Sequence, residues 1–151
     1  MKKNKKVFLG GTCNESTWRD ELIKKLKIDY FNPVVDNWNE EAQKKEKNQR
    51  INASFTLFVI TPLMKGVFSI AEVIDCSNKR PESTLFCVLE KDGDKEFEDF
   101  QIKSLNQVKE MVKDNGGNVF KNLDEISEFL NGNKDLKESI DRMQKLAGLN
   151  G

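Results

Sequence analysis

Phe55-Thr-Leu-Phe-Val-Ile60 is the stretch of this chain that decides its fold. Its six residues are apolar except for one threonine, and the run stops at Thr61-Pro62. A short run that is apolar on both faces is typical of a strand buried in a parallel sheet. The next segment, Ser69 to Ser77, has apolar residues at helical spacing. The two segments together predict a strand followed by a helix.

The same alternation extends from this unit towards both ends of the chain. Further strands are predicted over Lys6 to Gly10, Ile28 to Phe31, Thr84 to Leu89 and Val119-Phe120. Further helices are predicted over Thr17 to Leu26, Glu40 to Asn52, Ile102 to Val112 and Leu123 to Leu130. This alternation predicts an α/β fold, an open parallel sheet of about five strands with helices on both faces. Ligands of such sheets bind beyond the carboxyl ends of the strands, here the loops after Leu9, Phe31 and Ile60.

The length of the chain, 151 residues, indicates one main domain. We expect residues 1–133 to form the α/β domain. Residues 134–151 are expected to form an amphipathic helix, because one stripe of it collects Leu136, Ile140, Met143 and Leu146. We expect this helix to pack on the domain or on a neighbouring subunit.

Charge and residue usage exclude several classes of protein. The 25 Lys and Arg residues balance the 25 Asp and Glu residues, so no overall charge attracts a nucleic acid polymer or an anionic membrane. The chain has no histidine, which excludes Ser-His-Asp and Cys-His catalysis and histidine-ligated metals. Acid–base or nucleophilic chemistry must then use carboxylates, cysteines, lysines or Tyr30.

The cysteines indicate the compartment. Cys13, Cys76 and Cys87 form no Cys-x-x-Cys pair, and their odd number argues against a disulfide framework and a thiolate metal site. The apolar run behind the basic start MKKNKK is too short for a signal sequence or a membrane span. We therefore expect a cytoplasmic protein with no membrane attachment, no metal and no organic cofactor.

Two of the three loops carry residues suited to ligand binding. The glycines of Gly10-Gly11-Thr12 allow the backbone to approach a ligand, and the same residues also suit a tight strand-to-helix turn. The loop from Asn32 to Trp38 holds a proline, an acid and a tryptophan. These residues suit a wall for a flat base or a sugar, and equally a hydrophobic staple for the next helix.

The third loop leads to Glu72, in the helix predicted after the central strand. Ser69-Ile-Ala-Glu72 has the form of a capping box, with Ser69 at the N-cap and Glu72 three residues later. A carboxylate at a helix N-terminus is also favoured in its ionised form, which suits a nucleophile. The sequence leaves the cap and the nucleophile open, and one residue can serve as both.

Three stretches of the chain together resemble one known family. They are VFLGGTCN from Val7, DYFNPVVDNW from Asp29 and LFVITPLMKGVFSIAEVIDCSNKRPE from Leu57, of which the last is the most specific. In this order they are similar to the nucleoside 2-deoxyribosyltransferase-like family, over roughly Val7 to Leu89. The resemblance implies a flavodoxin-like fold and a homo-oligomer whose sites can borrow residues from a neighbouring subunit.

The resemblance also implies a retaining mechanism that uses two carboxylates. The nucleophilic glutamate of the family matches Glu72 in GVFSIAE. The family's second carboxylate, an aspartate that handles the proton of the leaving base, matches Glu46. From the residues alone, Glu46 is equally one charge of the solvated run Glu40 to Lys47.

The substrates implied are a nucleoside or nucleotide and a free nucleobase. The residues that would bind them lie in the three loops: Gly10, Gly11, Thr12, Asp36, Trp38, Met64, Lys65 and Gly66. Among these, Asp36 and Trp38 would line the sugar or base side, and Lys65 is a candidate to pair with a 5'-phosphate.

Two positions depart from the family pattern. Ser54 stands where the family often has an aspartate at the start of the central strand. Gly66, six residues before Glu72, stands where transferases tend to have an acid and monophosphate hydrolases a serine. Three functions therefore stay open: a nucleoside 2-deoxyribosyltransferase, an N-glycosidase of nucleoside 5'-monophosphates, and a non-catalytic nucleotide-binding module.

Overall fold

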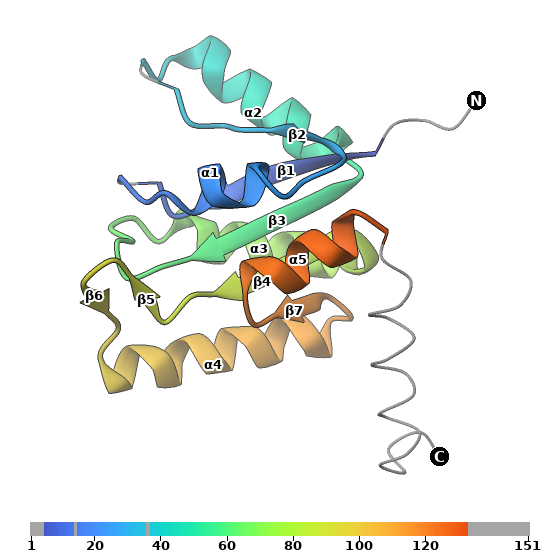
Figure 1. Cartoon of the computed structure of the whole chain (residues 1–151). Coiled ribbons are helices and arrows are strands. Elements are labelled where there is room, and N and C mark those ends of the chain that lie inside the picture. The colour runs from blue at the N-terminus through green and yellow to red at the C-terminus, as the bar shows by residue number, and fades with distance from the viewer. Residues whose placement is uncertain (1–4, 14, 36, 133–151) are drawn as a thin grey trace, which may run out of the picture.

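The main feature of the computed structural model, which describes residues 5–13, 15–35 and 37–132, is a five-stranded sheet (Figure 1). Its strands are β1 (Lys6–Gly11), β2 (Asp29–Phe31), β3 (Phe55–Ile60), β4 (Thr84–Val88) and β7 (Asn118–Phe120). They pair in the order β2-β1-β3-β4-β7, and every pairing is parallel. This flavodoxin-like order confirms the predicted fold. The strand order reverses between β1 and β3, which is where such folds bind ligands.

Helices follow the strands as predicted. They are α1 (Trp18–Ile23), α2 (Glu40–Asn52), α3 (Phe68–Lys79), α4 (Asp99–Asp114) and α5 (Leu123–Leu130), with a short 3-10 turn at Pro81–Ser83. The bounds of β3, α2 and α5 agree with the prediction, whereas α3 and α4 begin before and end after the predicted ranges. The apolar pattern alone marks only the buried part of such a helix.

The core lies on both faces of the sheet because alternate strand residues point in opposite directions. One set packs with α1 and α5 and includes Leu57, Val59, Leu85 and Cys87. The other packs with α3 and α4 and includes Phe58, Ile60, Phe86 and Val88. Both faces are thus covered by helices, as predicted, whereas α2 contains no buried residue.

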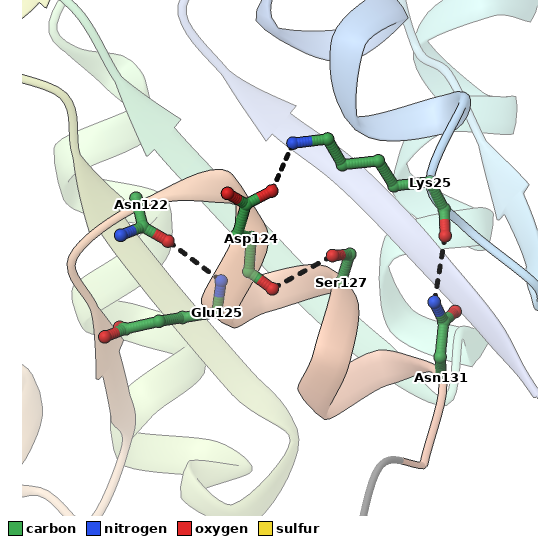
Figure 2. Close-up of polar contacts among 6 residues, drawn as sticks. All are labelled: Lys25, Asn122, Asp124, Glu125, Ser127 and Asn131. Carbon is green, nitrogen blue, oxygen red and sulfur yellow. Dashed lines mark hydrogen bonds and ion pairs between the residues drawn. The ribbon is translucent and has the colours of Figure 1, made fainter. Parts of the chain in front are cut away.

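Polar contacts join both ends of α5 to the segment after α1 (Figure 2). Lys25 forms an ion pair with Asp124. The Asn131 side chain donates to the Lys25 carbonyl at 2.8 Å and accepts from the Lys27 amide at 2.7 Å. Residues 24 and 25 form a turn and Leu26 lies outside α1, so the predicted helix over Thr17 to Leu26 is too long.

One element was not predicted. Strands β5 (Lys91–Asp92) and β6 (Lys95–Glu96) form an antiparallel hairpin after β4. Gly93-Asp94 forms the two-residue turn, with Gly93 at a φ of +62°, and this dipeptide was the available signal. Ser16 donates to Asp92 at 2.5 Å, which ties the hairpin to the loop after β1.

The predicted amphipathic segment 134–151 lies outside the described residues. Within the described part of the chain, no helix is long and apolar enough to cross a membrane. The three cysteines are free, with Cys13 exposed and Cys76 and Cys87 buried.

Candidate active site

A cavity of about 220 Å³ lies at the carboxyl end of β1, where the strand order reverses. It is enclosed by the end of β1 and the loop after it, the loop after β2, and helices α1, α2 and α3. The residues that line it are Phe8, Gly10, Gly11, Cys13, Arg19, Pro33, Val34, Val35, Trp38, Glu46, Ser69 and Glu72. Both predicted catalytic carboxylates therefore face one cavity, although they are 26 positions apart in the sequence.

The β1 side of the cavity is built from Gly10 and Gly11, and neither position has room for a side chain. A Cβ at Gly11 would lie 2.1 Å from the Val59 carbonyl oxygen, and Gly11 has a φ of +111°. A Cβ at Gly10 would lie 2.8 Å from the Phe58 ring. The glycines thus allow β1 to pair with β3, and they also expose backbone to the cavity.

Arg19 holds this backbone in place. Its guanidinium is 5% exposed and donates to the carbonyls of Leu9, Gly11 and Thr12 at 3.0, 3.2 and 2.6 Å. Burial lowers the pKa of Arg19 to about 10, so the group stays charged at neutral pH. Among the described residues that line the cavity, Arg19 is the only cation.

Thr12 is not part of the cavity wall. Its side chain is buried, and its hydroxyl accepts a hydrogen bond from the Thr61 amide at 3.0 Å. Its carbonyl accepts from the Trp18 indole at 2.7 Å as well as from Arg19. Thr12 therefore braces the loop after β1 against the end of β3 rather than facing a ligand.

The capping box predicted at Ser69 and Glu72 is wrong. Helix α3 begins at Phe68 with Val67 as N-cap, and no side chain caps it. Ser69 therefore lies inside the first turn, and Glu72 lies beyond it. Glu72 is 8% exposed and lines the cavity, where it forms an ion pair with Arg50.

Helix α2 supplies the second carboxylate. Glu46 and Arg50 are four residues apart, which places them on the same face of α2, towards α3. The Arg50 Nε lies 3.5 Å from Glu72 Oε2. Both atoms are buried, and neither has a hydrogen-bond partner among the described residues.

The two carboxylates influence each other. Burial raises the pKa of Glu72 to about 7, with a further upward effect from Glu46 that Arg50 opposes. Burial also raises the pKa of Glu46, again against Arg50. The expectation that the helix N-terminus favours ionised Glu72 is therefore wrong, because desolvation outweighs it. Near pH 7, Glu72 exists in both its neutral and its ionised form.

Part of the cavity wall is apolar. It is made by Pro33, Val34, Val35 and Trp38 from the segment between β2 and α2. Trp38 is 56% exposed, so its ring is free to contact a flat ligand. Asp36, the other residue predicted here, lies outside the described residues.

The predicted set Met64, Lys65 and Gly66 does not line this cavity. Met64 packs against the core beside α3 and α4, while Lys65 and Gly66 are exposed. The helix start that follows them brings Ser69 and Glu72 to the cavity and leaves the loop itself outside.

Sequence reasoning missed both arginines of the site. The spacing of Arg50 from Glu46 was visible, but a polar helix offers no sign of which face meets another element. In the sequence, Arg19 cannot be distinguished from a surface cation on an amphipathic helix. Its contacts with β1 carbonyls become apparent only in the folded structure. In the described residues, no group of three or more His, Cys, Asp or Glu side chains gathers that could hold a metal.

Comparison with known families agrees with this geometry. The model of the family described as nucleoside 2-deoxyribosyltransferase like matches residues 4–91, which include β1 to β4 and both carboxylates. The chain belongs to this family. Such membership is typical of glycosyl-transferring or glycoside-hydrolysing enzymes that bind nucleosides or nucleobases. No curated protein and no solved structure matches the chain significantly.

Proposed function

We propose that this nucleoside 2-deoxyribosyltransferase-like protein cleaves the N-glycosidic bond of 2'-deoxynucleosides and transfers the sugar to another base. The observation that carries the proposal is the pair of carboxylates, Glu46 and Glu72, in one cavity that also has an apolar wall. Neighbouring carboxylates with raised pKa values are typical of catalytic acid and nucleophile pairs.

Glu72 is assigned as the nucleophile. Its ionised carboxylate attacks the anomeric carbon, a C–O ester bond forms, and the C–N bond breaks with its electrons going to the base. Protonated Glu46 gives its proton to the leaving base. In the second half, a nitrogen of another base attacks the anomeric carbon, Glu72 leaves as a carboxylate, and Glu46 takes the proton of the incoming base.

The apolar wall is assigned to the base. Val34, Val35 and Trp38 are exposed and offer a surface on which a flat heterocycle can stack. The partners are then a nucleoside and a free nucleobase, and the chemistry needs no cofactor. A homo-oligomer in the cytoplasm is part of the same proposal, and sedimentation at several concentrations tests the oligomer.

The leading alternative is hydrolysis of nucleoside 5'-monophosphates. Its candidate phosphate contact, Lys65, is exposed and does not line the cavity. Thr12, the other candidate, uses its hydroxyl for the Thr61 amide. Arg19 is then the cation best placed for a phosphate, and its three guanidinium contacts to backbone carbonyls reduce what it has left to offer.

The test is base exchange followed by chromatography. The purified protein is incubated with each 2'-deoxynucleoside and a different free base, and separately with each 5'-monophosphate. We expect a new deoxynucleoside with the wild type, and loss of at least about 1000-fold in rate with Glu72→Ala.

The matched control is Glu41→Gln, which removes an exposed carboxylate from the same helix as Glu46. It should exchange bases at the wild-type rate. Free base from monophosphates alone would move the assignment to hydrolysis. No product from any substrate with folded wild-type protein would contradict an enzymatic role and favour the non-catalytic module.

A further inference from the structure

Arg50 contacts a catalytic candidate of the site without facing the cavity itself. It forms its ion pair with Glu72 at 3.5 Å but does not line the cavity. Its side chain is 17% exposed and that of Glu72 9%, so solvent screens the pair weakly. Arg50 therefore acts on the cavity through the carboxylates that line it: Glu72, with which it forms the ion pair, and Glu46, whose pKa it lowers.

The charged and titratable groups around Glu72 come from several elements. Glu46 on α2 repels its charge, and Arg50 on the same helix attracts it. Arg19 from α1 and Cys13 from the loop after β1 line the same cavity. On α3 itself, the buried thiol of Cys76 lies one turn further on and is also influenced by Arg50. Of the described cations, Arg50 is the one that forms an ion pair with Glu72.

Arg50 is held in place by polar contacts, since α2 contributes no buried residue. The guanidinium of Arg80, just after α3, donates to the carbonyls of Arg50 and Ile51. The ammonium of Lys45 lies 5.9 Å from the centre of the Phe31 ring. The C-terminal end of α2 is thus fixed against the end of α3, which keeps Arg50 opposite Glu72.

We propose that Arg50 is a positioning residue that increases the ionised fraction of the buried Glu72 carboxylate and holds it in a fixed orientation for attack. The nucleophilic role of Glu72 in this proposal rests on the proposed function. The effect of Arg50 on the charge and orientation of Glu72 rests on the ion pair and its burial. A lone carboxylate at this depth beside Glu46 favours its protonated form, which is not nucleophilic. The Arg50 Nε, which lies 3.5 Å from Glu72 Oε2, counters both the desolvation of Glu72 and its repulsion by Glu46.

The test follows the titration of Glu72 directly, in protein labelled with ¹³C at the glutamate side-chain carboxyl carbon. The Glu72 resonance is assigned by its loss in Glu72→Gln. In Arg50→Gln and Arg50→Met, we expect the titration midpoint to rise by about one pH unit. The ionised fraction of Glu72 at pH 7 then falls about fivefold, starting from a midpoint near 7. Arg50→Lys, which keeps the charge, should recover part of the shift.

The matched control is Lys47→Gln, which removes an exposed cation from the same helix. It should leave the midpoint unchanged. Two charge-removing variants are used so that one folded variant is enough, and folding is judged from the dispersion of the amide spectrum. An unchanged Glu72 midpoint in a folded Arg50→Gln or Arg50→Met protein overturns the proposal.

Kinetics adds a second readout. If the wild type exchanges bases, the acid limb of kcat/KM should move to higher pH in Arg50→Gln, with KM at pH 9 close to wild type. A uniform loss at all pH values would indicate a merely structural role and would contradict the proposal. Because the titration needs no substrate, an inactive wild type would refute the proposed function while leaving the Arg50 result readable.

Discussion

The loop after β1 and the α2–α3 contact border the same cavity, and each is in contact with an arginine that is at least partly buried. At the loop, Arg19 of α1 is hydrogen-bonded to three backbone carbonyls. At the α2–α3 contact, Arg50 forms one ion pair, and its Nε makes no hydrogen bond among the described residues. The Arg19 guanidinium holds the backbone after β1 in place, whereas the Arg50 guanidinium acts on the protonation of Glu72.

This difference shows that burial alone does not reveal the role of a charged residue. A charge whose donors are satisfied by carbonyls contributes to folding, and removing it deprives those carbonyls of a charged donor. A charge that faces a carboxylate with a raised pKa changes the protonation of that carboxylate instead. Replacing Arg19 is therefore expected to lower the stability of the fold, whereas replacing Arg50 is expected to change the protonation of Glu72.

The largest effect is expected at the end of β1, for Gly11→Ala. The new Cβ would lie 2.1 Å from the Val59 carbonyl, at a φ that favours glycine. We expect the free energy of unfolding to fall by more than about 4 kcal/mol, measured by urea denaturation. Gly66→Ala is the control, since its Cβ would meet no atom within 4 Å, and it should change stability by less than about 0.5 kcal/mol. Equal losses of stability in the two variants would contradict the close packing of Gly11 against Val59.

The two arginines provide the direct comparison. At pH 6, Arg19→Met should lower the free energy of unfolding by about 3 kcal/mol, because three carbonyls lose a charged donor. Arg50→Met should cost about 1 kcal/mol or less at the same pH, because Glu72 can take up a proton when its partner is removed. Urea unfolding followed by tryptophan fluorescence measures both. A larger loss of unfolding free energy in Arg50→Met than in Arg19→Met would contradict the assignment of Arg19 to the fold and of Arg50 to Glu72.

A smaller effect concerns pH. The folded protein holds the Glu72 proton up to about pH 7, whereas an unfolded chain releases it near the ordinary value of 4.5. The folded state therefore binds more protons in this range, and its stability falls as pH rises from 5 to 8. We expect Glu72→Gln to match the wild type at pH 5 and to exceed it at pH 8 by on the order of 2 kcal/mol. Parallel pH–stability curves for the two proteins would rule out a raised Glu72 pKa.

Much of the fold could be predicted from the sequence because its signals are local. The apolar run Phe55–Ile60 and the helices Glu40–Asn52 and Leu123–Leu130 have the predicted bounds. The predicted helix that proved too long lies at a distant contact. Just after the end of α1, Asn131 is hydrogen-bonded to Lys25 and Lys27, more than a hundred positions away.

The site could be predicted only in part. Glu72, Glu46, Gly10, Gly11 and Trp38 were named from the sequence and line one cavity. Thr12, Met64, Lys65 and Gly66 were named as well but do not line it, because a loop next to a site in sequence need not face it. Arg19 and Arg50 were missed because their partners lie on other elements.

The sequence by itself determined the strand–helix alternation, the absence of histidine chemistry and the family, since these depend on residue order and composition. Only the tertiary structure decided that Glu72 is not a helix cap and that its pKa is raised. It also decided which arginine braces a loop and which pairs with a carboxylate. The reason is physical: desolvation and charge interactions depend on the neighbours that folding brings within a few ångströms.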